Sequence, residues 1–260
     1  MTESSRDTKT ALITGAARRI GASIAKALHQ RGYNVIIHYN HSKDDADCLV
    51  ESLLAIRANS AVAIQANLQE LSDLDRLSES ATAQWGHINL LVNNASCFYP
   101  TPITDTITSQ QSDNSTKLVD WNTIIDTNLR APYFLSLSLA DELRKVNGAI
   151  INLVDIYAER PLKHHSIYNI SKAGIAMTTQ TLARELAPEI RVNGVSPGAI
   201  LWPENESTEQ NAAQQRIVSQ TPMARSGAPE DICEAVCYLA ASSFVTGQII
   251  KVDGGRSLYL

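Results

Sequence analysis

Two side chains in the segment "SIYNISKAG" could move a proton. Tyr168 and Lys172 stand four residues apart and would share one face of a helix. A phenol titrates near pH 10, and a neighbouring ammonium can lower its pKa until it acts as an acid near neutrality. The pair is therefore a candidate for general acid catalysis, although this spacing is common by chance.

A carboxylate ends an apolar run nearby. The segment "AIINLVDIY" at 149–157 is typical of a buried strand that only Asn152 interrupts, and it ends at Asp155. An acid at this position is either part of a reactive site at the strand end or a cap that starts the next helix. Both interpretations stay open on these residues alone.

A third segment, "ALITGAARRIGASIAKAL", has the order strand, glycine turn, helix. Gly15 and Gly21 bracket the turn, where backbone N–H groups can approach a phosphate at a helix N-terminus. A plain strand-to-helix corner is the alternative.

The second strand ends without the acid that usually holds an NAD ribose. It offers instead His38, Tyr39, Asn40, His41 and Ser42, with Arg18 and Arg19 upstream. Donors and positive charge suit a 2′-phosphate, so the sequence favours NADPH over NADH.

The elements that would position these residues alternate along the chain. Runs of strand length lie at 11–14, 34–39, 61–66, 88–95, 149–154, 191–197 and 248–255, and helical segments lie at 20–32, 44–58, 71–85, within 120–146, and at 168–187 and 229–243. The alternation predicts one α/β domain over 1–260, a Rossmann-type doubly wound parallel sheet of about seven strands with helices on both faces. Polar residues 103–117 and the proline-containing region 199–228 interrupt it. We expect loops there, and 199–228 as a substrate loop.

Composition excludes several classes of protein. Of 260 residues, 44% are hydrophobic and 19% charged, and the formal net charge of −5 argues against nucleic acid as a partner. The polar start "MTESSRDTKT" has no signal-peptide core and no apolar run reaches bilayer length, so we expect a cytoplasmic protein with no membrane partner. Cys48, Cys97, Cys233 and Cys237 lack a metal-type spacing, and we expect reduced thiols and no metal.

Together with "LVNNAS" at 91–96, Asn128 in "DTNLRAPYF" and "VDGG" at 252–255, these motifs resemble the short-chain dehydrogenase/reductase family over nearly the whole chain. The resemblance implies a catalytic group of Asn128, position 155, Tyr168 and Lys172. It further implies that NADPH contacts Gly15, Arg18, Arg19, Ile20, Gly21, His38, Tyr39, Asn40, His41, Ser42, Asn67, Leu68, Asn94, Ala95, Ser96, Tyr168, Lys172, Pro197 and Gly198. Arg19 replaces the middle glycine of the family's turn, and Asp155 replaces a serine.

The exchange at position 155 bears on the substrate. A serine hydroxyl stabilises charge that grows on a carbonyl oxygen, whereas a carboxylate repels it. Reduction of a C=N bond requires protonation of nitrogen, and an anion favours the cationic character that results. Asp155 therefore suggests an imine-type substrate such as a pterin.

The motifs "TGAARRIG", "HYNHS", "NNASCFYPTPI", "LVDIY" and "YNISKAG" resemble the pteridine reductases, which reduce dihydropterins or dihydrofolates with NADPH. By that resemblance Arg19 contacts cofactor and substrate, Ser96 hydrogen-bonds the pterin, and Phe98 stacks on it, next to Asp155 and Tyr168. His41 stands where these enzymes commonly have arginine, which weakens the charge on the 2′-phosphate. Asn67 stands where an acid is usual, and its amide could meet adenine.

Three other functions stay open. A carbonyl reductase for 3-oxoacyl thioesters or steroids would share the fold, and a dihydromonapterin or dihydrofolate reductase is nearly indistinguishable in sequence. A non-catalytic NADP sensor is disfavoured by the intact Tyr168 and Lys172. Family members pair subunits through the long helix from about Asp120 and the helix that carries Tyr168, so the resemblance also implies a homotetramer.

Overall fold

The strands form a single parallel sheet. The computed structural model describes residues 8–103, 114–200 and 208–259, and within them seven strands occur in the order β3-β2-β1-β4-β5-β6-β7. Every neighbouring pair is parallel. The strands are β1 (Thr10–Ile13), β2 (Asn34–Tyr39), β3 (Ala61–Gln65), β4 (Leu90–Asn93), β5 (Ala149–Leu153), β6 (Arg191–Pro197) and β7 (Ile249–Val252). The predicted doubly wound α/β fold is confirmed.

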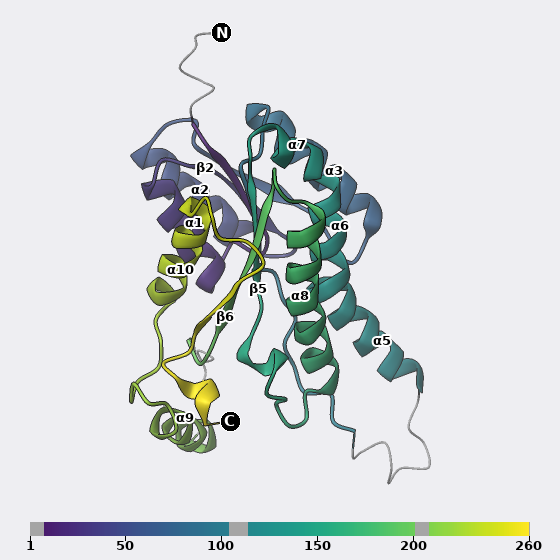
Figure 1. Ribbon diagram of the computed structural model, residues 1–260, viewed down its shortest axis with the longest axis vertical. Coiled ribbons are helices and arrows are strands. Elements are labelled where there is room, and N and C mark those ends of the chain that lie inside the picture. Colours follow the sequence, from purple (N-terminus) through teal and green to yellow (C-terminus); the bar gives the residue numbers. More distant parts are fainter. Residues whose placement is uncertain (1–7, 104–113, 201–207, 260) are drawn as a thin grey trace.

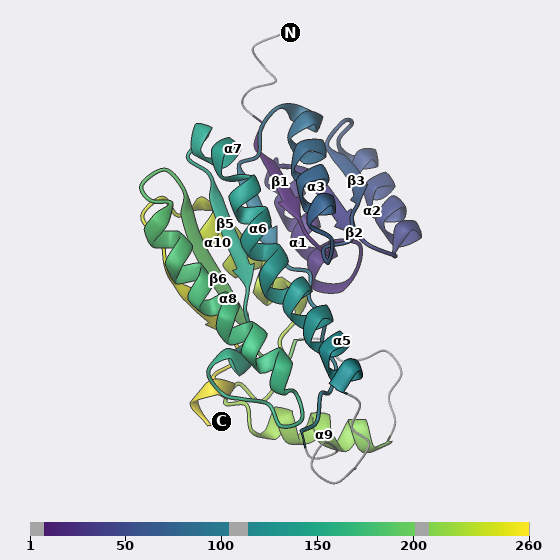
Figure 2. The same ribbon diagram turned by 90° about the vertical axis from the view of Figure 1, so that its right-hand side faces the viewer.

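Helices cover both faces of this sheet (Figures 1 and 2). One layer contains α1 (Arg19–Gln30), α2 (Lys43–Ile56) and α10 (Pro229–Ala241). The other contains α3 (Leu71–Trp85), α6 (Ala131–Ser138), α7 (Ala140–Lys145) and α8 (Ser166–Glu185). Two further helices, α5 (Asn114–Ile125) and α9 (Thr208–Ser219), extend toward the end of the molecule where the central strands finish (Figure 2).

Successive strand residues point into opposite layers, as a period of two requires. Ile13 and Ile37 pack in the layer of α1 and α10, whereas their neighbours Leu12 and Ile36 pack in the layer of α3 and α6. All four are fully buried. Burial on both faces explains why the strands appear in the sequence as continuous apolar runs rather than as alternating ones.

The strand order reverses between β1 and β4. The chain winds outward from β1 through β2 to β3, then returns to β4 and winds the other way. The loops after β1 and β4 therefore leave the sheet in opposite directions and open a crevice between them, which is where ligands bind in such sheets. The glycine turn follows β1 and the segment "NAS" at 94–96 follows β4.

Two helices differ from the sequence expectation. The helix expected from about Asp120 begins at Asn114, inside the polar region 103–117, of which 104–113 lie outside the described residues. It then passes through a wider π-helical turn, Asp126–Arg130, in which the N–H of Ala131 donates to the oxygen of Asp126. Within 199–228, the described part contains α9 rather than loop alone, and 201–207 are not described.

The cysteines match the expectation of reduced thiols. Cys233 and Cys237 lie buried on the core face of α10, and all four cysteines are free thiols. In the parts of the chain that the structure describes, no helix combines the length and apolar character needed to cross a bilayer.

The asparagine that interrupts the apolar run of β5 connects three elements. The Asn93 amide at the end of β4 donates to Asn152 Oδ1 (2.8 Å), and the Asn152 amide donates to Thr179 Oγ1 in α8 (2.9 Å). Asn152 and Thr179 are 0% exposed and Asn93 is 5% exposed. Because an unpaired buried polar group is costly, this series of hydrogen bonds fixes α8 against the ends of β4 and β5.

We expect Asn152→Ala to lower the free energy of unfolding by about 2–4 kcal/mol, because the Asn93 amide keeps only its long 3.4 Å contact to Ser136 Oγ and a cavity opens. Urea denaturation measures this. Gln84→Ala, on the exposed face of α3, is the control and should change stability by less than about 0.5 kcal/mol. Equal effects of the two substitutions would show that the buried amides contribute nothing.

Candidate active site

The turn after β1 is locked to the segment after β4. Thr14 Oγ1 accepts the backbone N–H groups of Asn94 (2.9 Å) and Ala95 (3.0 Å), and the Asn94 amide donates to the Gly15 oxygen (3.0 Å). A side chain on Gly15 would place its Cβ 2.9 Å from Ala95 Cα, and one on Gly21 would lie 2.3 Å from the Gly15 oxygen. Both glycines are thus required by the close approach of the two loops.

Arg19 has a backbone conformation that favours glycine. Its φ is +54°, in the left-handed region, where a side chain costs roughly 1–2 kcal/mol. This explains why the motif that the chain resembles has glycine at the same place. Arg18, in extended conformation, precedes the first turn of α1, and both arginine side chains are exposed. Two guanidinium groups therefore flank a helix N-terminus, an arrangement suited to phosphate.

The two loops and the ends of β2 and β3 enclose a cavity of about 500 Å³. Its lining consists of Gly15, Ala17, Arg18, Arg19, Ile20, Gly21, His38, Tyr39, Asn40, His41, Ser42, Asn67, Leu68, Gln69, Asn94, Ala95, Ser96, Cys97 and Thr127. No carboxylate occurs among them. All cofactor residues expected from 15 to 96 lie here. Ala17, Gln69, Cys97 and Thr127 were missed, and their only sequence signal is that each lies one or two residues from an expected site residue.

His38 lines this cavity but needs a correction. We expected its imidazole to face a phosphate, whereas Nδ1 accepts the Gly15 N–H (3.0 Å) and Nε2 lies 3.1 Å from the Ala66 oxygen. Since Gly15 donates, the ring must be the neutral tautomer that donates from Nε2. Burial lowers the pKa of His38 to about 4, although Ala66 and Asp73 oppose the shift. The neutral imidazole of His38 therefore stabilises the glycine turn by hydrogen bonding.

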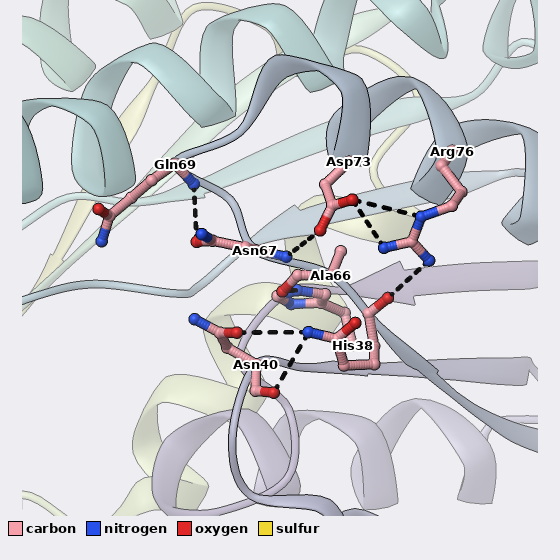
Figure 3. Close-up of polar contacts among 8 residues, drawn as sticks. His38, Asn40, Ala66, Asn67, Gln69, Asp73 and Arg76 are labelled. Atoms are coloured by element: carbon pink, nitrogen blue, oxygen red, sulfur yellow. Dashed lines mark hydrogen bonds and ion pairs between the residues drawn. The ribbon is translucent and has the colours of Figure 1, made fainter.

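Next to His38, a polar network joins the segment after β3 to the first turn of α3 (Figure 3). The backbone N–H of Asn67 donates to Asp73 (2.7 Å), and Asp73 pairs with Arg76 (2.8 Å). These contacts hold the pKa of Asp73 below its ordinary value, with the Asn67 bond as the largest cause. Asn67 Oδ1 accepts the Gln69 N–H (3.1 Å) and keeps one lone pair for a donor from the cavity.

Charged residues meet at the outer edge of the cavity. Arg18 Nε lies 3.4 Å from a carboxylate oxygen of Asp45 in the first turn of α2, and both side chains are exposed. The same hollow is also lined by His41, Ser42, Lys43 and a second acid, Asp44. A phosphate bound here would share Arg18 with Asp45.

Asp155 has two roles, one for each carboxylate oxygen. Oδ1 accepts the N–H of Tyr157 (2.9 Å) and so caps the short 3₁₀ turn Ile156–Ala158. Oδ2 accepts the hydroxyl of Tyr168 (2.7 Å). The cap interpretation is therefore confirmed, and the carboxyl group also lies beside Tyr168, where its part in a reaction stays a prediction.

The tyrosine does not have the lowered pKa that we expected. Burial, followed by the adjacent Asp155, raises the pKa of Tyr168 well above 10. Burial also raises the pKa of Asp155, against the opposing effects of the Tyr157 N–H and the Lys172 ammonium. Both groups thus tend to retain a proton, and they are joined by a hydrogen bond along which a proton can pass.

Lys172 and Asn128 hold the backbone around this pair. Lys172 Nζ is buried and donates to the Leu153 oxygen (2.9 Å), and burial lowers its pKa to about 8, opposed by Asp155. The Asn128 amide, in the π-helical turn, accepts the Cys97 N–H (2.7 Å) and donates to the Cys97 oxygen (2.9 Å) and to Ser171 Oγ (3.1 Å). Asn128 therefore ties the segment after β4 to α8.

Aromatic rings border the pair. Phe98 is 55% exposed and meets Tyr168 edge-on, with 4.8 Å between ring centroids. His165, just before α8, stacks on Phe98 at 4.7 Å with planes 14° apart. Pro197 ends β6 and Gly198 follows, with its N–H bonded to the Val252 oxygen (3.0 Å). All these groups lie at the carboxyl ends of parallel strands, on the same edge as the cavity.

Comparison with known proteins agrees with this geometry. A family model described as enoyl-(acyl carrier protein) reductase matches residues 15–257. The chain belongs to the short-chain dehydrogenase/reductase family. Pteridine reductase 1 of Leishmania tarentolae is 35% identical over 280 residues, covering 95% of this chain and 96% of that protein. As a short-chain dehydrogenase/reductase, the chain is an oxidoreductase.

Other relatives of the same family are as similar. The 3-oxoacyl-[acyl-carrier-protein] reductase FabG of Staphylococcus aureus is 36% identical over 252 residues, covering 95% of this chain and 98% of that protein. The 3beta-hydroxysteroid dehydrogenase 1 of Eggerthella lenta is 34% identical over 262 residues, covering 96% and 94%. Overall identity therefore does not separate pteridine from carbonyl substrates within the short-chain dehydrogenase/reductase family.

His38 gives a test of pH-dependent stability. Its pKa is about 6.5 when unfolded and about 4 when folded, so the unfolded chain binds the proton first as the pH falls. The stability that the neutral ring contributes is present above pH 6.5 and is lost by about pH 4, a difference of about 3 kcal/mol. Urea unfolding should show this loss in the wild-type protein and not in His38→Gln. Parallel pH profiles would contradict the assignment.

Proposed function

We propose that the protein is an NADPH-dependent pteridine reductase, which transfers hydride to a C=N bond of a dihydropterin or dihydrofolate to give the tetrahydro form. The observation that carries the proposal is the carboxyl group of Asp155 hydrogen-bonded to the Tyr168 hydroxyl at 2.7 Å. A carbonyl reductase needs a neutral donor at this position, whereas a ring nitrogen that gains a proton benefits from an acid.

In this mechanism, bound NADPH supplies the hydride, which carbon 6 of a 7,8-dihydropterin accepts. Nitrogen 5 receives the proton from Tyr168, Asp155 or ordered water. Burial raises the pKa of both side chains, and the Tyr168 hydroxyl, whose pKa lies well above 10, carries its proton at neutral pH and donates it to Asp155 in a hydrogen bond. Phe98 offers an exposed ring on which a flat pterin can stack, and Ser96 and Arg19 line the neighbouring cavity as polar partners for its edge.

Lys172 and Asn128, the remaining members of the catalytic group, position the groups around Asp155 and Tyr168. The buried ammonium of Lys172 lies 5.6 Å from the centre of the Tyr168 ring and favours the charged form of Asp155. It is also the cation that would hold a nicotinamide ribose, alongside Tyr168. Asn128 keeps the segment that carries Ser96 and Phe98 in register with α8.

The cavity supports NADPH in particular. Its glycine turn leads into the N-terminus of α1, where backbone N–H groups favour a pyrophosphate, and both glycines line the cavity. The edge that would meet the 2′-phosphate offers Arg18, His41 and Ser42. Among the described residues, the main cavity has no carboxylate to hold a ribose diol, whereas Asp44 and Asp45 border the phosphate edge and Asp45 is paired with Arg18.

The proposed homotetramer has a surface that supports it. Large apolar side chains are exposed along α5, α6 and α8, which lie side by side in both views (Figures 1 and 2). They include Leu118, Trp121, Phe134, Leu137, Ile170 and Met177. Apolar exposure on this scale is typical of a surface that packs against another subunit.

Replacement of the acid tests the substrate class. Asp155→Ala should reduce kcat for 7,8-dihydrobiopterin at least about 100-fold, because the proton donor pair is lost. NADPH binding should change less than threefold, as measured by fluorescence titration. Tyr168→Phe should have a similar effect on kcat. Unchanged turnover in Asp155→Ala would remove this residue from the mechanism.

The matched variant is Asp155→Ser, which restores the residue usual in carbonyl reductases and can still cap the turn. It should lose dihydropterin reduction and gain activity on a 3-oxoacyl thioester, followed by NADPH absorbance. A wild-type protein that reduced ketones and ignored dihydropterins would identify a carbonyl reductase. NADPH binding without turnover of any substrate would identify a sensor.

Cofactor preference should depend on the Arg18–Asp45 pair. The wild type should have a higher kcat/KM with NADPH than with NADH, and equal values would contradict the assignment. Asp45→Asn frees Arg18 and should tighten NADPH about two- to fivefold without affecting NADH, since an exposed ion pair contributes about 0.2–1 kcal/mol. Glu51→Gln, at an exposed position further along the same helix and outside this hollow, removes the same charge and is the control that should leave both affinities unchanged.

A further inference from the structure

A second hollow, of about 300 Å³, lies beyond Asp155 and outside the cofactor cavity. Its walls are Tyr157, Arg160, Pro161, Leu162, Lys163 and Arg256. Three of the six are cations and none is an acid. The neighbouring Glu159 is engaged with Lys251 (2.6 Å), so it does not neutralise them.

Arg256 is the unusual member of this group. It begins the 3₁₀ turn Arg256–Leu258 and is only 6% exposed. One guanidinium nitrogen donates to the Ile217 oxygen in α9 (3.1 Å), but its buried Nε has no hydrogen-bond partner. The nearby Asp253 carboxylate accepts the N–H groups of Gly255 (2.9 Å) and Ser257 (2.8 Å).

Across the described residues, no carboxylate pairs with Arg160, Lys163 or Arg256. A guanidinium stays charged at all relevant pH values, and a buried charge without a counter-charge is costly. The hollow therefore has the electrostatic character of an anion-binding site.

The hollow is physically connected to the reactive pair. Tyr157 donates its N–H to Asp155 and forms one wall of the hollow. Burial raises the pKa of the Tyr157 hydroxyl, and the nearby Arg256 guanidinium opposes this shift. The Leu162 backbone is held at both its N–H (3.2 Å) and its oxygen (2.9 Å) by the amide of Asn169, the residue after Tyr168. In Figure 1 the C-terminal turn, in yellow, lies beside α9 at the same end of the molecule.

We propose that Arg160, Lys163 and Arg256 bind the anionic end of the substrate's side chain, a carboxylate or phosphate, while the ring lies against Asp155 and Tyr168. This deepens the proposed function and rests on it for the identity of the ring. The site would favour a dihydropterin with a charged tail, such as the glutamate of dihydrofolate, over one with a neutral side chain.

The test compares two substrates that share the reacting ring. Steady-state rates are measured with 7,8-dihydrofolate and 7,8-dihydrobiopterin for the wild type and for Arg160→Gln/Lys163→Gln, whose two side chains are exposed and can be removed without disturbing the core. KM for dihydrofolate should rise at least about tenfold with kcat unchanged, and KM for dihydrobiopterin should stay within twofold. Raising the salt concentration should weaken dihydrofolate alone in the wild type.

Arg144→Gln/Lys145→Gln is the matched control. It removes the same charge from exposed positions at the end of α7, before β5 and thus at the opposite edge of the sheet, and should leave both KM values unchanged. Equal changes for both substrates in the Arg160/Lys163 variant, or none, would overturn the proposal.

A binding measurement separates failure of the site from failure of the proposed function. If the wild type reduces neither pterin, calorimetric titration with glutarate still tests the site. Binding that weakens at least tenfold in Arg160→Gln/Lys163→Gln supports it, and absent or unaffected binding overturns it. Binding of inorganic phosphate without binding of glutarate would identify a free-anion site and would also overturn the assignment to a substrate tail.

Discussion

One hydrogen bond, from the Tyr168 hydroxyl to Asp155, joins α8 to the segment after β5 at the site. Asp155 comes from the end of β5 and Tyr168 from the first turn of α8. Their distance depends on how α8 lies against the sheet, and the buried amides of Asn93 and Asn152 together with Thr179 fix that relation. The polar residues inside the core thus act on the geometry of the reacting groups as well as on stability.

The fold was accessible from the sequence because its cause is local and repeated. Buried parallel strands are continuous apolar runs, and each helix has its own apolar face, so alternation alone predicts the sheet. The lining of the cavity was predictable because the glycine turn and the segments after the strands resemble the motifs of a known family, whose cofactor residues they then implied. The start of α5 was not, because residues 114–117 are as polar as the loop before them.

The sequence did not predict side-chain roles that depend on burial or on contacts with residues far along the chain. His38 is an imidazole in a segment rich in donors, and only the contacts to Gly15 and Ala66 reveal that the ring is neutral and stabilises the glycine turn. The pKa of Tyr168 is raised rather than lowered because burial, and after it the adjacent Asp155, disfavours the phenolate. Arg256 stands about 100 residues from Tyr157, and no spacing rule could have paired them.

Arg19 carries a consequence for attempts to engineer this protein. Its left-handed backbone costs the native state free energy that glycine would recover, yet its side chain lines the cavity that the rest of the turn is built to shape. A selection for thermal tolerance alone would therefore tend to replace Arg19 by glycine, and the gain in stability would remove a guanidinium from the cavity. Screens on this scaffold need a functional readout at every round.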